Sequence, residues 1–83
     1  MKRNNNQPYD EVLDITTEYL GPAAKRFVDR QILSHLDKTP PNLSLEDMPV
    51  LVDWIKVSVA LLTDDRKLVN KYIDQLLTLT PNT

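Results

Sequence analysis

The stretch YLGPAAKRF, residues 19–27, contains the only glycine of the chain and places it directly before a proline. Gly21 can adopt the left-handed backbone conformation that closes a helix, because it has no Cβ. Pro22 has a fixed φ and no N–H group to leave unpaired, so it suits the first turn of a helix. The stretch therefore predicts that one helix ends at Leu20 and the next begins at Pro22, with a sharp corner and almost no loop between them.

The segment before this corner, residues 9–20, has the pattern of an amphipathic helix. Its apolar residues fall on one side of a helical wheel, and its carboxylates fall on the other. The apolar side holds Tyr9, Val12, Leu13, Ile15, Thr16, Tyr19 and Leu20, and the acidic side holds Asp10, Glu11, Asp14 and Glu18. We expect this first helix to pack through its apolar side.

After the corner, residues 22–36 predict a second helix whose apolar side includes two polar residues, Gln31 and His35, one turn apart. We interpret them as a buried polar pair, which needs hydrogen-bond partners in an apolar interface. In one interpretation the pair lies at a helix-packing edge or in a small buried network. In the other it faces a ligand or senses pH, since histidine titrates near neutral pH.

The outer side of this second helix is basic. Lys25, Arg26 and Arg30 lie on it, and the two arginines are one turn apart. Arginines at this spacing can bind a carboxylate or phosphate through paired hydrogen bonds. The alternative is that these cations face water or the acidic side of the first helix. The basic side is therefore the second functional interpretation, a small anion- or nucleic-acid-binding module.

Residues 37–49, DKTPPNLSLEDMP, predict a loop, because two successive prolines prevent a helix. Ser44 and Asp47 have the spacing of a capping box, which predicts a short turn at residues 45–48. The third helix is then expected over residues 47–63.

This third helix is unusually apolar. Its apolar residues cover roughly 220° of the helical wheel, against the roughly 100° that a surface helix needs. Either it is the central helix of the monomer, or part of it contacts a second copy or another protein. The candidate contact residues on it are Val52, Trp54 and Val59. Trp54 is expected in the core, and if it is exposed it becomes the first candidate for an interaction anchor, since tryptophan is enriched in binding hot spots.

A fourth helix is expected over residues 64–78, with two aspartates in its first turn. The chain is therefore predicted to be all-α, with residues 9–79 forming one compact four-helix bundle. We expect a disordered N-terminal tail at residues 1–8 and a short C-terminal tail at residues 80–83.

Composition and charge argue against several functions. The 83 residues carry a formal net charge of −2 and no cysteine, so neither general attraction to nucleic acid nor disulfides are expected. No apolar run approaches the roughly 18 residues of a membrane span, so a cytoplasmic protein is expected. Asp10, Asp14 and Glu18 have a spacing that could present oxygens to Mg²⁺, but we interpret them as a solvated helix face. With one histidine and no glycine-rich phosphate loop, we expect no catalytic residues, no cofactor and no metal site.

The sequence YLGPAAKRFVDR at residues 19–30, followed later by RKLVNKYIDQLL at residues 66–77, resembles a small uncharacterised helical domain that opens with Tyr-Leu/Ile-Gly-Pro. In bacteria that domain is appended to serine/threonine kinases and other regulatory proteins. The resemblance covers residues 19–77 and implies a bacterial regulatory or adaptor module that binds protein. We expect no kinase or receiver domain beside it, so its output would come through a protein partner or a homodimer. The functional prediction is a non-enzymatic protein–protein interaction module with a regulatory or scaffold role.

Overall fold

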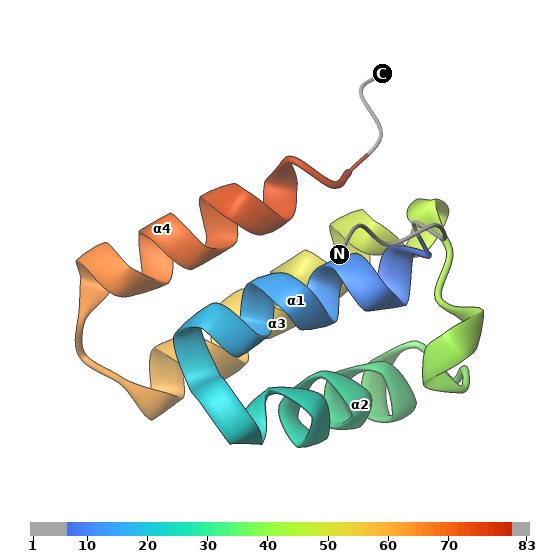
Figure 1. The fold of residues 1–83 in the computed structure, drawn as a ribbon, viewed down its shortest axis with the longest axis horizontal. Coiled ribbons are helices and arrows are strands. Elements are labelled where there is room, and N and C mark those ends of the chain that lie inside the picture. Colours follow the sequence, from blue (N-terminus) through green and yellow to red (C-terminus); the bar gives the residue numbers. More distant parts are fainter. Residues whose placement is uncertain (1–6, 81–83) are drawn as a thin grey trace, which may run out of the picture.

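The structure is a computed structural model and describes residues 7–80. Within that range all regular structure is helical, which confirms the all-α class. The α-helices are α1 (Pro8–Leu20), α2 (Ala24–His35), α3 (Met48–Leu62) and α4 (Arg66–Leu77), and short 3₁₀ helices lie at Gly21–Ala23, Pro40–Asn42 and Leu45–Asp47 (Figure 1). Most of the two expected tails, residues 1–6 and 81–83, lies outside the described residues.

The α-helices enclose a core between them. Figure 1 shows α1 crossing in front of α3, with α4 on one side of the pair and α2 on the other. α1 packs against both α2 and α4, and α3 packs against the same two helices. The buried apolar cluster consists of Val12, Val28, Ile32, Leu43, Met48, Leu51, Val52, Ile55, Val59, Val69, Tyr72, Ile73 and Leu76. Every α-helix thus contributes to a single apolar core.

The corner between α1 and α2 lies at Gly21, as predicted, but α2 starts later than expected. Gly21 has a φ of 60° and a ψ of −135°, so its φ is positive while its ψ lies outside the left-handed helical region. Its N–H donates to the carbonyl oxygen of Thr17 and closes the last turn of α1. The N–H of Ala24 then donates to the carbonyl oxygen of Gly21, which forms the tighter 3₁₀ turn Gly21–Ala23. Because of this turn, α2 begins at Ala24 rather than at Pro22.

Gly21→Ala is expected to lower the free energy of unfolding by about 1 to 2 kcal/mol, because an L residue is strained at this combination of φ and ψ. A Cβ built on Gly21 has no other atom within 4 Å, so the expected loss comes from backbone strain and not from a clash. Urea denaturation followed by circular dichroism measures it. The control is Lys71→Ala, an exposed change on α4 that should stay within about 0.5 kcal/mol. Equal stability of the two variants would contradict the strain at Gly21.

A pair of hydroxyl groups links α1 to α4 inside the core. Thr16 Oγ1 donates to the carbonyl oxygen of Val12 at 2.8 Å and lies 2.7 Å from Tyr72 Oη. Since the threonine has one proton to give, the Tyr72 hydroxyl donates to Thr16. Burial raises the pKa of Tyr72 to about 12. The buried neutral phenol therefore contributes stability that is complete below pH 10.0 and is lost as the pH rises toward 12.

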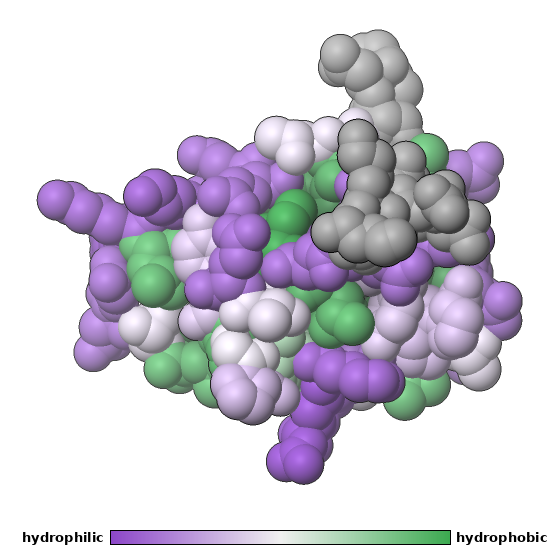
Figure 2. Space-filling model, viewed as in Figure 1, coloured by the Kyte–Doolittle hydropathy of each residue, from purple (hydrophilic) through white to green (hydrophobic). Residues whose placement is uncertain are grey.

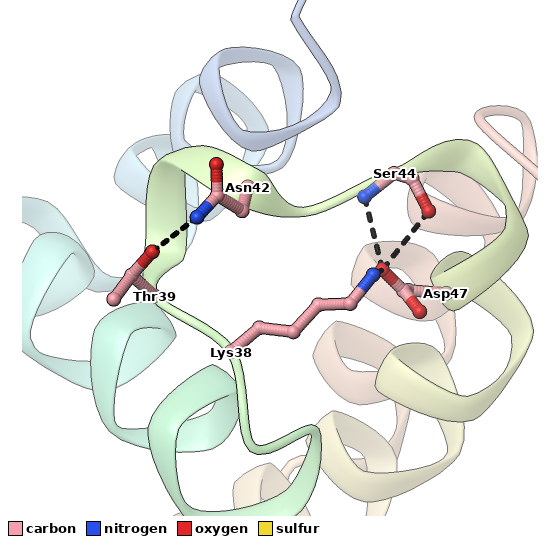
Figure 3. Close-up of polar contacts among 5 residues, drawn as sticks. All are labelled: Lys38, Thr39, Asn42, Ser44 and Asp47. Atoms are coloured by element: carbon pink, nitrogen blue, oxygen red, sulfur yellow. Dashed lines mark hydrogen bonds and ion pairs between the residues drawn. The ribbon is translucent and has the colours of Figure 1, made fainter.

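The segment between α2 and α3 is held by polar contacts around Asp47 (Figure 3). Asp47 Oδ2 accepts hydrogen bonds from Ser44 N and Ser44 Oγ at 3.0 Å each, and it pairs with Lys38 Nζ at 2.5 Å. These contacts include the predicted capping box, and Asn42 Nδ2 donates to Thr39 Oγ1 in the turn before it. The hydrogen bond from Lys38 lowers the pKa of Asp47 below its ordinary value of 3.8. The carboxylate therefore stabilises the fold above pH 3.8 and loses this contribution as the pH falls through the lowered pKa.

Candidate protein-interaction surface

α3 has two apolar sides, and the structure buries one of them. The buried side holds Met48, Leu51, Val52, Ile55 and Val59. The other side carries Val50, Trp54, Val57 and Leu61, whose exposed fractions are 48, 40, 55 and 83%. Their spacing of four, three and four residues places them in one row along the helix. We call these four residues the α3 strip.

Apolar surface elsewhere on the described chain is scattered. Figure 2 shows the face on the α1 side, where hydrophilic side chains separate small apolar patches. The other large apolar residues that are exposed are Leu33, Leu45, Leu62 and Leu77. They come from α2, a 3₁₀ turn and the last residues of α3 and α4, so they do not form a row on one helix side. The α3 strip is therefore the clearest candidate contact surface among residues 7–80.

The contact residues predicted on α3 are partly wrong. Val52 and Val59 are 2% and 1% exposed, so they pack in the core and cannot touch a partner of the folded chain. α3 packs against α2 and α4 and leaves its other apolar side exposed, so it is not a central helix covered on all sides, as the first alternative expected. Trp54, which we expected in the core, is instead 40% exposed and lies in the strip. The sequence contains a signal for the three members that we missed, Val50, Val57 and Leu61. Val50 and Val57 are seven residues apart, as are Trp54 and Leu61, and this repeat places them on one side of a helix.

His35, the last residue of α2, lies flat on Trp54. The two ring centroids are 3.9 Å apart and the ring planes differ by 2°. The expectation that His35 belongs to a buried polar pair is wrong, because its side chain is exposed. α2 ends at this residue, and the imidazole covers one face of the indole instead of entering the core. The stacked ring restricts the orientation of Trp54.

Gln31, the other member of the expected pair, is buried, with 6% of its surface exposed. Ser58 Oγ on α3 donates a hydrogen bond to Gln31 Oε1 at 3.0 Å. This bond satisfies the buried amide oxygen, which is the packing role that the first interpretation assigned to Gln31. It also ties together the two helices that carry His35 and Trp54, and so it helps to hold the stacked rings in place.

The basic side of α2 contains a carboxylate as well as cations. Lys25 Nζ pairs with Asp29 Oδ2 at 2.8 Å, and Tyr9 Oη donates to Asp29 Oδ1 at 2.5 Å. The hydrogen bond to Asp29 raises the pKa of Lys25. Arg26 and Arg30 line the same surface hollow as Lys25 and Asp29. The three predicted cations are therefore brought together, but a phosphate bound among them would meet the negative charge of Asp29.

Two further observations concern metals and membranes. Residues 7–80 hold no group of three or more His, Cys, Asp or Glu side chains placed to bind a metal ion. In the same part of the chain, no helix combines the length and apolar character that crossing a membrane requires.

In comparisons with family models, with curated proteins and with solved structures, nothing matches the chain. The functional argument therefore starts from the α3 strip.

Proposed function

We propose that this chain is a compact four-helix bundle that acts as a non-enzymatic protein–protein interaction module, and that the α3 strip is its contact surface. The observation that carries the proposal is the row of four apolar side chains on the side of α3 that the core does not use. Covering apolar surface stabilises a complex by roughly 25 cal/mol per Å². Contiguous apolar surface on a folded chain is typical of protein contact sites.

Trp54 is the proposed anchor of this surface. Tryptophan is enriched among the residues that dominate binding energy, because its large rigid ring buries much area with few rotatable bonds. Its stacking on His35, with ring centroids 3.9 Å apart, already restricts the indole. A partner that covers Trp54 therefore removes less side-chain freedom than it would from a mobile ring.

We propose that the chain has a regulatory or scaffold role in the cytoplasm, which it performs by binding a partner protein through the α3 strip. The resemblance of residues 19–77 to a helical domain attached to bacterial serine/threonine kinases supports it, since such a domain would act by binding protein. The alternative role in binding anions or nucleic acid is weakened by Asp29, whose carboxylate neutralises part of the basic side of α2. The four residues of the α3 strip are all apolar, so no charge among them opposes the binding of an apolar partner surface.

A photo-crosslinking amino acid at position 57 tests this proposal in cells that make the chain. We expect protein adducts there, because Val57 is 55% exposed at the middle of the strip. The control carries the same amino acid at position 33, because Leu33 is also 55% exposed but lies along the hollow on the outer side of α2. Absence of adducts at position 57, or adducts only at position 33, would contradict the proposal.

A further inference from the structure

We infer that a hollow at the corner between α1 and α2 binds a small carboxylic acid that carries an apolar group. The residues that line this hollow are Leu20, Ala23, Arg26, Phe27, Arg30 and Leu62. They come from the end of α1, the 3₁₀ turn after it, α2 and the last residue of α3, which lie together at one end of the bundle (Figure 1). We call it the corner hollow. No residue of the α3 strip lines it, so the inference concerns a second site.

Arg26 and Arg30 border two hollows that differ in charge. On the outer side of α2 they share a hollow with Lys25 and Asp29, where the carboxylate opposes a bound anion. The corner hollow, which they also line, has no acidic residue in its wall. Asp29 is already bound by Lys25 Nζ at 2.8 Å and by the hydroxyl of Tyr9. In the corner hollow, therefore, no lining residue opposes the positive charge of the two arginines.

The two guanidinium groups are available for a ligand. Both arginines are exposed, and within residues 7–80 neither guanidinium forms an ion pair or a hydrogen bond. They are four residues apart, so their side chains leave the same side of α2 one turn apart. A guanidinium presents its N–H groups as a planar fork that matches the two oxygens of a carboxylate. Two such groups at this spacing can bind one carboxylate between them.

The rest of the lining is apolar, and this decides the class of anion. Leu62 is 64% exposed, so an apolar group that covers it removes hydrocarbon surface from water. A phosphate monoester carries close to two negative charges at neutral pH and would lose hydration against apolar walls. A monocarboxylate carries one charge and can be attached directly to a hydrocarbon group. The lining therefore favours an apolar carboxylic acid over phosphate or nucleic acid.

The volume of the corner hollow indicates a small molecule. It is about 350 Å³, near the lower end of the roughly 300 to 1,000 Å³ of small-molecule sites. Octanoate is a suitable probe, because it joins one carboxylate to a flexible hydrocarbon chain. With about ten non-hydrogen atoms and the binding energy per atom of small ligands, it should bind with a Kd of roughly 1 mM or lower.

An NMR titration of the full chain with octanoate near pH 7, where the acid is ionised, tests the inference. We expect saturable shifts of the backbone amides of residues 20–30 and 62, and of the Nε–H signals of Arg26 and Arg30. Absence of saturation up to about 10 mM octanoate overturns the inference. Shifts confined to the α3 strip overturn it as well, because they would place the chain of the ligand on that surface.

Three further probes test the class of ligand. Acetate has the charge without the chain, 1-octanol has the chain without the charge, and inorganic phosphate has more charge and no apolar group. Each is expected to bind at least about tenfold more weakly than octanoate, because the corner hollow offers both the arginines and the apolar wall. If any of the three binds as tightly as octanoate, the assignment to an apolar carboxylic acid is overturned.

The double variant Arg26→Gln/Arg30→Gln is expected to raise the Kd for octanoate at least about tenfold, because it removes both charged forks. Its matched control is Lys67→Gln/Lys71→Gln, which removes the same charge from two exposed cations one turn apart on α4, outside the corner hollow. Circular dichroism should show that both remain helical, since all four side chains are exposed. Equal loss of binding in the two double variants would reflect net charge alone and overturns the inference.

Leu62→Asn tests the apolar wall, with Leu77→Asn as its control. Both leucines are exposed and occupy the last residue of a helix, α3 and α4 respectively, but Leu77 is not in the corner hollow. Leu62→Asn is expected to raise the Kd for octanoate about threefold or more, because the hydrocarbon chain loses apolar contact. Leu77→Asn is expected to leave it unchanged. An unchanged Kd in Leu62→Asn, or an equal rise in both variants, overturns the inference.

Discussion

Val59→Asp is expected to abolish the cooperative fold, whereas Val57→Asp, two residues away on the same helix, is expected to leave it nearly unchanged. Val59 is 1% exposed in the core, and Val57 is 55% exposed on the α3 strip. A carboxyl group at position 59 would be buried among apolar side chains, at a cost of about 4 kcal/mol or more. A small domain has a total stability near the low end of roughly 5 to 15 kcal/mol, so this cost removes most of it.

Thermal melting and urea denaturation, both followed by circular dichroism at low protein concentration, compare these two variants. Val57→Asp is expected to stay within about 0.5 kcal/mol of the unchanged chain, because its carboxylate remains in water. Low concentration keeps contacts between copies of the chain from contributing to the measured stability. If Val59→Asp melts cooperatively near the original midpoint, α3 turns its other side to the core, and the strip that we define here would be buried.

The corner at Gly21 could be predicted because it depends on neighbouring residues alone. A lone glycine that ends one helix and a proline that suits the start of the next leave few other conformations. The capping box between Ser44 and Asp47 also depends only on residues close in sequence, and the structure confirms it. The 3₁₀ turn at Gly21–Ala23 was missed, because Pro at a first helical position fits an α-helix and a 3₁₀ helix equally well.

The buried side of α3 could not be predicted from its sequence. An apolar arc of roughly 220° is wider than the side that a helix buries in an ordinary surface position, so several rotations of the helix about its axis satisfy the pattern. Which rotation occurs depends on α2 and α4, which pack against it from distant parts of the chain. The structure turns Val59 inward and Trp54 outward. The candidate surface therefore keeps Trp54 but otherwise consists of Val50, Val57 and Leu61, which we had not named as contact residues.

Gln31 and His35 show the same limit within one helix. Their spacing of one turn places both on the same side of α2, so the sequence predicts the same degree of burial for both. Gln31 meets Ser58 and is buried, whereas His35 lies at the last residue of α2, stacks on Trp54 and remains exposed. The difference arises because Gln31 meets Ser58 of α3 and His35 meets Trp54 of α3. These contacts depend on another helix, so the sequence of residues 22–36 cannot predict them.

Thr16→Val is expected to lower the free energy of unfolding by about 2 kcal/mol, although it removes one hydroxyl group and keeps nearly the same volume. Thr16 is fully buried, and its Oγ1 lies 2.7 Å from Tyr72 Oη. Without that oxygen the Tyr72 hydroxyl stays in the core with no acceptor, and an unpaired buried polar group costs more than a hydrogen bond contributes.

Tyr72→Phe is the matched control, because it removes the other partner of the same hydrogen bond. Thr16 Oγ1 keeps its bond to the carbonyl oxygen of Val12 at 2.8 Å, so this variant leaves no polar group unpaired and should lose about 1 kcal/mol or less. In the double variant both hydroxyl groups are absent, and its stability should match that of Tyr72→Phe and exceed that of Thr16→Val. Urea denaturation of the three variants gives the coupling energy between the two residues. Additive losses would mean that Thr16 and Tyr72 do not interact, and that α1 and α4 are held together by apolar packing alone.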